Sequence, residues 1–142
     1  MTTLVDSSVL LDVVAPSPWR HWSEVALAAA VDAGPVGINQ VVYAEVAVGF
    51  SSAGRLERTL QGVGFIRLGL PWSAAWRVAE AFRSYRSRGG PRTTPLPDFF
   101  IGAHAAAAGL RLLTRDAARV RTYFPEVELI APAPDEPARR YT

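Results

Sequence analysis

Cysteine and lysine are both absent from this chain of 142 residues, and histidine occurs only twice. Without cysteine there can be neither a disulfide nor a thiolate metal site, and His21 and His104 are too few for a histidine-rich zinc site. Any metal must therefore be held by oxygen.

No apolar run reaches the roughly 18 residues of a membrane span, and Asp6 comes too early for a signal-peptide core. We expect a cytoplasmic protein with no membrane partner.

The charge balance gives little overall attraction for nucleic acid. All fifteen basic residues are arginine, which we interpret mainly as a reflection of genomic base composition, and the net charge is only +2. The arginines do gather in two segments, 83–92 and 111–121. The apolar fraction of 49% is ordinary for a globular protein. We expect one domain over residues 1–131 and a proline-rich tail over 132–142.

Short apolar runs alternate with amphipathic segments along the chain. These patterns predict strands over residues 2–6, 36–38, 65–68, 110–114 and 126–130. They predict helices that begin after residue 6 and over residues 18–33, 40–50, 55–60, 72–88 and 95–108. Parallel strands need crossover connections, so this alternation favours an α/β fold with a mostly parallel central sheet.

Two of the predicted helices have an aromatic face, and a third has no polar face. Trp19, Trp22, Ala26 and Ala29 recur at helical spacing, as do Trp72, Trp76, Ala79 and Phe82. The helix over residues 40–50 is apolar on every side apart from Glu45, which predicts burial all round.

Asp6 and Asp116 each follow a predicted strand. Ligands of open α/β sheets bind outside the carboxyl ends of the strands, so both positions suit a site. A structural explanation is also open for each residue. Asp6 can cap the helix that follows it, and acidic residues are common in turns of the kind that holds Asp116.

Glu45 and Asp98 lie on predicted helices. An ionised carboxylate in an apolar helix is costly unless a cation or hydrogen bonds compensate it, so Glu45 indicates a site or, alternatively, a buried pair with arginine. Asp98 stands at the start of its helix, where free amides and the helix dipole favour a carboxylate without any further role.

All four acids can face a single crevice, and this conjunction favours a metal site. Converging carboxylates raise one another's pKa unless positive charge is bound between them, and oxygen ligands select magnesium or manganese. Such ions can orient and deprotonate a water and stabilise the leaving oxygen of a phosphodiester. The sequence has neither a Walker phosphate loop nor a G-x-S-x-G elbow, and we interpret His104 as a packed core histidine.

Four segments of the chain resemble the four successive motifs of PIN domains, specifically those of VapC toxins, over residues 4 to about 131. They are Val5-Asp6-Ser7-Ser8-Val9-Leu10-Leu11, Tyr43-Ala44-Glu45-Val46, Leu96-Pro97-Asp98-Phe99-Phe100-Ile101-Gly102-Ala103-His104-Ala105 and Leu112-Leu113-Thr114-Arg115-Asp116. The resemblance implies a PIN-like three-layer α/β/α fold and a magnesium-dependent (Mg²⁺) endoribonuclease. It also implies a homodimer and a cognate antitoxin. A segment of that antitoxin, often carrying an arginine, would insert into the pocket and block it.

The resemblance also implies a role for each acid. Asp6 and Asp98 would be the principal metal ligands, Asp116 would help to bind metal, and Glu45 would complete the pocket and is a candidate to assist the water. Thr114 and Ser8 match polar positions of the family that support the acids.

Arginines and tryptophans outside these motifs are candidates for RNA contacts. Arg88 and Arg92 flank the glycine-rich loop before Asp98 and are expected to contact phosphates, although solvated arginines near a turn are an equal alternative. Trp19 and Trp22 can stack on bases, but their helical spacing favours core or dimer packing.

Two other functions stay open at this point. One is a PIN nuclease of RNA maturation or DNA processing without an antitoxin, which the absence of an adjacent antitoxin gene would indicate. The other is a non-catalytic binding module, against which the full set of four acids argues.

Overall fold

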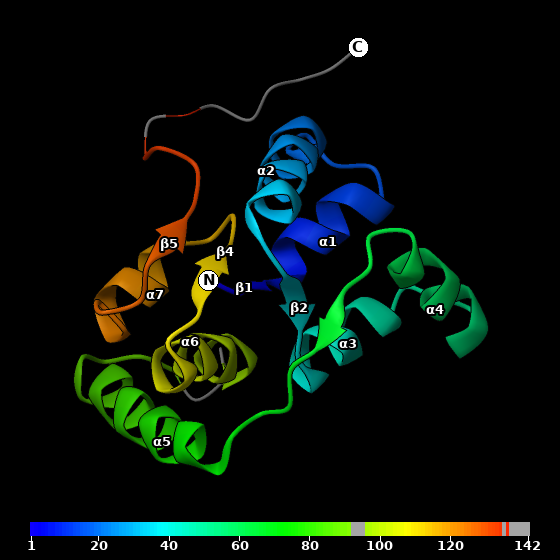
Figure 1. Ribbon diagram of the computed structural model, residues 1–142. Helices are drawn as coiled ribbons and strands as arrows, with labels where there is room; N and C mark the ends of the chain where they lie inside the picture. The colour runs from blue at the N-terminus through cyan, green and yellow to red at the C-terminus, as the bar shows by residue number, and fades with distance from the viewer. Residues whose placement is uncertain (92–95, 135, 137–142) are drawn as a thin grey trace.

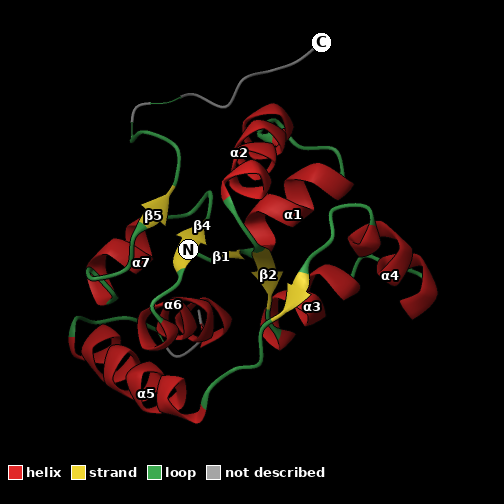
Figure 2. Cartoon of the chain, in the orientation of Figure 1, coloured by secondary structure: helices red, strands yellow, loops and turns green. Residues whose placement is uncertain are grey.

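The computed structural model describes residues 1–91, 96–134 and 136. Five short strands form one sheet within these ranges, and every pair of neighbouring strands is parallel (Figure 2). The strands are β1 (Thr3–Val5), β2 (Val36–Ile38), β3 (Ile66–Arg67), β4 (Arg111–Leu113) and β5 (Leu129–Ile130). The predicted α/β class with its parallel sheet is confirmed, although most strands are shorter than their apolar runs suggested.

Seven helices of the described ranges flank this sheet, with α1 and α2 on one side of it and α5 and α6 on the other (Figure 1). They are α1 (Ser7–Val14), α2 (Arg20–Ala33), α3 (Gln40–Ala47), α4 (Ala53–Gln61), α5 (Trp72–Ser87), α6 (Leu96–Ala108) and α7 (Ala118–Tyr123). The sequence patterns predicted six of them but not α7. Most of the predicted tail lies outside the described residues.

The strand order is β3-β2-β1-β4-β5, which puts β1 in the centre of the sheet. Leu4 pairs with Gly37 on one side and with Leu112 on the other, and all three residues of β1 are buried. The chain leaves β1 toward β2 and later returns to β4, on the opposite side. Such a reversal of strand order opens a crevice at the carboxyl ends of the two strands, here β1 and β4.

The most buried residues of α2 and α5 are not those of their aromatic faces, and α3 is less buried than its sequence suggests. The buried stripe of α2 is Ser23, Leu27 and Ala30, and that of α5 is Ala74, Val78 and Ala81. Trp72 and Trp76 are 92% and 64% exposed. Helix α3 buries only Val42 and Val46, so the prediction that it is buried all round was wrong. The neighbours of a helix decide which of its apolar residues are covered, and α3 packs mainly against α1 and α6.

Within the described ranges, no helix combines the length and the apolarity that crossing a bilayer demands.

Helix α6 has a glycine where it meets a buried ring. A Cβ atom on Gly102 would lie 2.5 Å from Cδ2 of Phe124, a residue that is 1% exposed. The ring of Phe124 also packs edge-on against Phe99 of α6, with the centroids 6.4 Å apart. Because Gly102 has no side chain, the ring of Phe124 can pack directly on α6, the helix that carries Asp98. This contact holds the end of α7 against α6.

We expect Gly102→Val to destabilise the protein by about 1–3 kcal/mol, because the added methyl groups must displace a ring that is enclosed in the core. Urea unfolding followed by circular dichroism measures the change. Ala107→Val, at an exposed position of the same helix, is the control and should be nearly neutral. Equal stability of the two variants would contradict the packing described.

Candidate active site

Asp6 stands directly after β1, and its carboxylate is held by hydroxyl groups. Its Oδ2 atom accepts hydrogen bonds from Ser8 Oγ at 2.6 Å and from Thr114 Oγ1 at 2.8 Å. Although Asp6 is at the N-cap position of α1, its side chain makes no capping bond to a described helix amide. The structural alternative of a helix cap therefore does not account for Asp6, which is 8% exposed and faces the carboxyl end of β4 instead.

The exit of β4 is tied to the same carboxylate. Thr114 Oγ1 accepts a hydrogen bond from the backbone amide of Asp116 at 3.0 Å while its proton goes to Asp6. Ser8 Oγ in turn accepts from the backbone amide of Arg115 at 3.1 Å. Two hydroxyl groups thus place the turn that carries Asp116 beside Asp6.

Glu45 approaches Asp6 through Ser7. The hydroxyl of Ser7 donates to Glu45 Oε1 at 2.8 Å and lies 3.5 Å from Asp6 Oδ1. Glu45 is half-buried and has no arginine partner among the residues described, so the alternative of a buried ion pair is not what the structure shows.

Asp98 lies in the first turn of α6 and is paired with an arginine of α7. Arg119 Nη1 donates to Asp98 Oδ2 at 2.7 Å, and the two side chains are 40% and 47% exposed. An arginine partner had been considered for Glu45 and not for Asp98.

These side chains border an open cleft of about 790 Å³ at the carboxyl ends of β1 and β4. Asp6, Asp98 and Asp116 line it, together with Thr114 and Arg119. Asp116 is the most exposed of the three acids, with 75% of its side chain accessible. Glu45 is not a lining residue and reaches the cleft only through Ser7 and Asp6.

The acids influence one another electrostatically. Burial raises the pKa of Glu45, and the charges of Asp6 and Asp98 raise it further against the hydrogen bond from Ser7. Burial and the charge of Asp6 also raise the pKa of Asp98, although Arg119 opposes the shift. Burial is the main cause of both shifts, and the neighbouring carboxylates add to it.

The donor atoms suit a hard divalent cation in kind, since they are carboxylate and hydroxyl oxygens. In the described part of the chain, however, no three His, Asp or Glu side chains are gathered closely enough to coordinate one ion as they stand. One visible reason is that Asp98 is turned to Arg119. The side chains of Asp98 and Asp116 are both partly exposed and have room to rotate.

A buried network behind the cleft was missed by the sequence patterns. Asp12 of α1 is 2% exposed and accepts hydrogen bonds from Ser17, Ser23 and Arg115, at 2.7, 2.7 and 2.8 Å. The guanidinium of Arg115 also lies over the ring of Trp19, 5.9 Å from its centroid. Asp12 thus anchors the residue between Thr114 and Asp116. The available signal was a carboxylate between Leu11 and Val13, in the otherwise apolar segment six residues after Asp6.

His104 is a packed core residue, as the sequence indicated. It is 2% exposed, and burial lowers its pKa. Its Nδ1 atom lies 3.1 Å from Asn39 Nδ2. Because Asn39 Oδ1 already accepts from the amide of Val42 as the cap of α3, the amide nitrogen of Asn39 faces the ring and Nδ1 of His104 is the acceptor.

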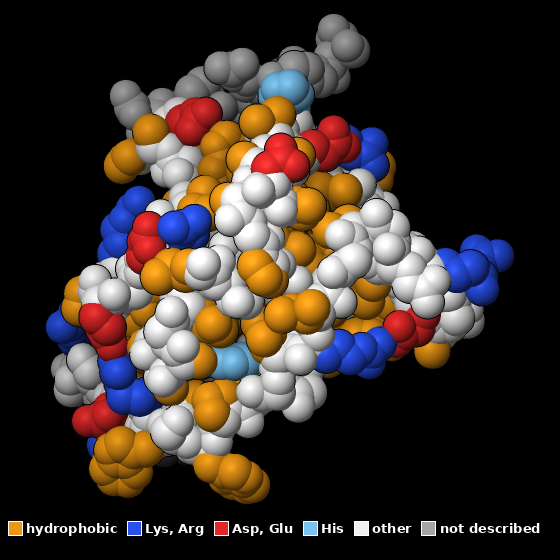
Figure 3. All heavy atoms as spheres, in the orientation of Figure 1, with side chains coloured by type: hydrophobic (Ala, Val, Ile, Leu, Met, Phe, Trp, Pro, Cys, Tyr) orange, Lys and Arg blue, Asp and Glu red, His pale blue; other side chains and the backbone are white. Residues whose placement is uncertain are grey.

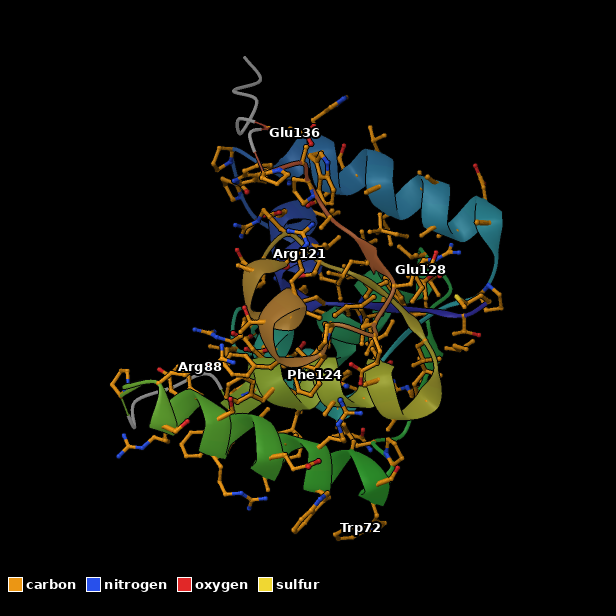
Figure 4. All side chains as sticks on the ribbon, turned by 90° about the vertical axis from the view of Figure 1, so that its left-hand side faces the viewer. Trp72, Arg88, Arg121, Phe124, Glu128 and Glu136 are labelled. Atoms are coloured by element: carbon orange, nitrogen blue, oxygen red, sulfur yellow. The ribbon has the colours of Figure 1, made fainter. Side chains whose placement is uncertain are left out.

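Two other candidates border the cleft. Trp19 lines it, whereas Trp22 packs against the core. The guanidinium of Arg88 lies 5.4 Å from the centroid of Tyr123, which also lines the cleft. Figure 4 shows Arg88 and Trp72 at opposite ends of α5. Arg92 lies outside the described residues.

Charges of both signs are interspersed along the face in Figure 3, in keeping with the small net charge.

The fold is shared with solved toxin–antitoxin structures. VapBC2 from Rickettsia felis, bound to a DNA fragment from their promoter, is 14% identical with a TM-score of 0.71, over 94% of this chain and 100% of that one. FitAcB from Neisseria gonorrhoeae is 20% identical with a TM-score of 0.63, over 89% and 95%. A toxin-antitoxin complex from Klebsiella pneumoniae is 24% identical with a TM-score of 0.63, over 88% and 94%.

No curated protein matches the chain significantly. The sequence model of the PIN domain family, by contrast, matches residues 3–125. This range includes β1, β4 and all four acids of the candidate site. Because the match spans most of the chain, the protein belongs to the PIN domain family.

Proposed function

We propose that this protein is a metal-dependent endoribonuclease that hydrolyses RNA phosphodiester bonds. The observation that carries the proposal is the convergence of Asp6, Asp98 and Asp116 on one cleft, with Glu45 joined to Asp6 through Ser7. Membership of a family of nucleases supports the same chemistry. Mg²⁺ is the proposed cofactor, with Mn²⁺ as an alternative.

Each acid has a distinct part in the proposed reaction. Asp6 and Asp98 hold the cation from the end of β1 and the start of α6, and Asp116 adds a third carboxylate from the exit of β4. The bound cation would activate a water and stabilise charge on the leaving oxygen. Glu45 assists the water as an acceptor for its proton, a role that its raised pKa favours.

We propose further that the protein is the toxin of a VapBC-type pair and forms a homodimer. Support for the toxin role comes from solved structures of the same fold, which include VapBC2 from Rickettsia felis and a toxin-antitoxin complex from Klebsiella pneumoniae. An antitoxin would then cover the cleft and block the acids. Growth inhibition on expression without the antitoxin is the expected cellular effect.

Asp6→Asn and Asp98→Asn should abolish RNA cleavage, because each removes the negative charge that holds the cation. The loss should exceed the roughly 10–100-fold effect typical of residues that only support metal ligands. Cleavage of total RNA in Mg²⁺, with mapping of the new 5′ ends, measures both activity and target. Asp32→Asn, at an exposed position of α2, is the matched control. Cleavage that persists in EDTA would reject the proposed chemistry.

Glu45→Gln should raise the thermal midpoint of the cation-free protein at pH 7.5. The amide keeps an oxygen for the bond from Ser7 and removes a charge that burial disfavours and that Asp6 and Asp98 oppose further. Because folding raises the pKa of Glu45, its ionised form destabilises the fold. The gain in the variant should therefore shrink as the pH falls through the pKa of the folded protein toward that of the unfolded chain.

The measurement is thermal unfolding in EDTA between pH 5 and pH 8. Glu24→Gln, on the exposed surface of α2, serves as the control and should show a smaller change. A lower midpoint for Glu45→Gln at pH 7.5 would show that the acids do not repel one another in the folded chain.

Arg88→Gln and Arg92→Gln should weaken RNA binding without sequence preference, if their guanidinium groups contact phosphates. Each lost contact should reduce the slope of log affinity against log salt by about 0.7 for single-stranded RNA. Titration in EDTA measures binding without cleavage. Arg83→Gln, whose guanidinium lies over Trp76, removes the same charge and is the control. An unchanged slope in the double variant would end this assignment.

A further inference from the structure

Arg119 is a feature of the cleft that the proposed chemistry does not use. It projects from α7, lines the cleft and donates from Nη1 to Asp98 Oδ2 at 2.7 Å. The contact is an ion pair between side chains that are each about half exposed. Arg119 is thus the residue that satisfies Asp98 in the cation-free chain.

The partner of Asp98 differs in kind from those of Asp6 and Glu45, and it lies closer than the arginine beside Asp116, whose Nη1 atom is 3.9 Å from Asp116 Oδ1. Asp6 accepts hydrogen bonds from Ser8 and Thr114, and Glu45 accepts one from Ser7. These hydroxyl groups are neutral and leave lone pairs of the carboxylates available to a cation. A guanidinium carries a full positive charge that repels a dication, and it covers the carboxylate oxygen to which it donates a hydrogen bond.

We propose that Arg119 is a built-in counter-ion of Asp98, which competes with the divalent cation and leaves Asp98 when the cation binds. This inference rests on the proposed function for the cation itself. Arg119 stabilises the cation-free cleft by opposing the charge repulsion that Asp98 receives from Asp6 and Asp116. Arg119 is therefore a positioning residue for Asp98.

The exchange requires no change of fold. The side chain of Arg119 is 40% exposed, so it can rotate into the open cleft while the backbone of α7 stays packed through Val120 and Phe124. A half-exposed ion pair is a weak interaction, which a dication that binds several carboxylates can overcome. The released guanidinium would remain in the cleft beside the acids.

The test is the affinity of the intact protein for Mn²⁺, measured by isothermal titration calorimetry without RNA. Arg119→Gln and the apolar Arg119→Met should bind Mn²⁺ about 2- to 5-fold more tightly than the wild type. Thermal unfolding confirms that both variants are folded. Arg121→Gln is the matched control, since Arg121 lies on the same helix and lines the same cleft. No described acid forms an ion pair with Arg121.

Both variants of Arg119 should exceed the gain that Arg121→Gln produces through its loss of charge alone. If Arg119→Gln and Arg119→Met bind Mn²⁺ no more tightly than Arg121→Gln, the counter-ion role is wrong and the proposed nuclease stands. If the wild type binds neither Mn²⁺ nor Mg²⁺, both proposals fail.

Discussion

The hydrogen bond from Thr114 to Asp6 is the contact on which the candidate site depends. It joins residues that are 108 positions apart and closes the gap between the ends of β1 and β4. A carboxylate that is 8% exposed needs such donors, because burial without them is costly. Ser8 and Thr114 supply them and also hold the turn of Asp116. The sheet thus positions Asp6, and the two hydroxyl groups that bind Asp6 also position the turn that carries Asp116.

Much of the fold could be predicted from local patterns. Apolar runs that end at Asp6 and before Asp116 indicated neighbouring strand ends, and the parallel sheet brings them together as expected. Helix α7 was missed because six residues hold little periodicity, although Val120 and Phe124 are buried at helical spacing. Without α7 there was no basis for a partner of Asp98. The covered faces of α2, α3 and α5 depend on neighbours that only the folded chain reveals.

The candidate site was predictable in its residues and not in its internal pairing. Four acids were singled out, and three of them line the cleft while Glu45 stands behind Asp6. Whether a given acid is bound by a hydroxyl group or by a guanidinium group depends on the tertiary structure. Arg115 binds Asp12 of α1 and Arg119 binds Asp98 of α6, although both line the cleft and belong to the same run of arginines. Composition alone does not distinguish the two orientations.

The bond between Asn39 and His104 connects the helices that bear Glu45 and Asp98. Asn39 begins α3, and His104 lies within α6, so the two segments share a polar link inside the apolar interior. The chain between α3 and α6 is long and includes α4, β3 and α5, whose buried residues belong to the same core. Because the link between Asn39 and His104 lies inside that core, insertions at exposed positions such as Ser51 and Ser52 would leave the spacing of the two helices unchanged. Related chains can therefore diverge at such exposed positions without loss of chemistry.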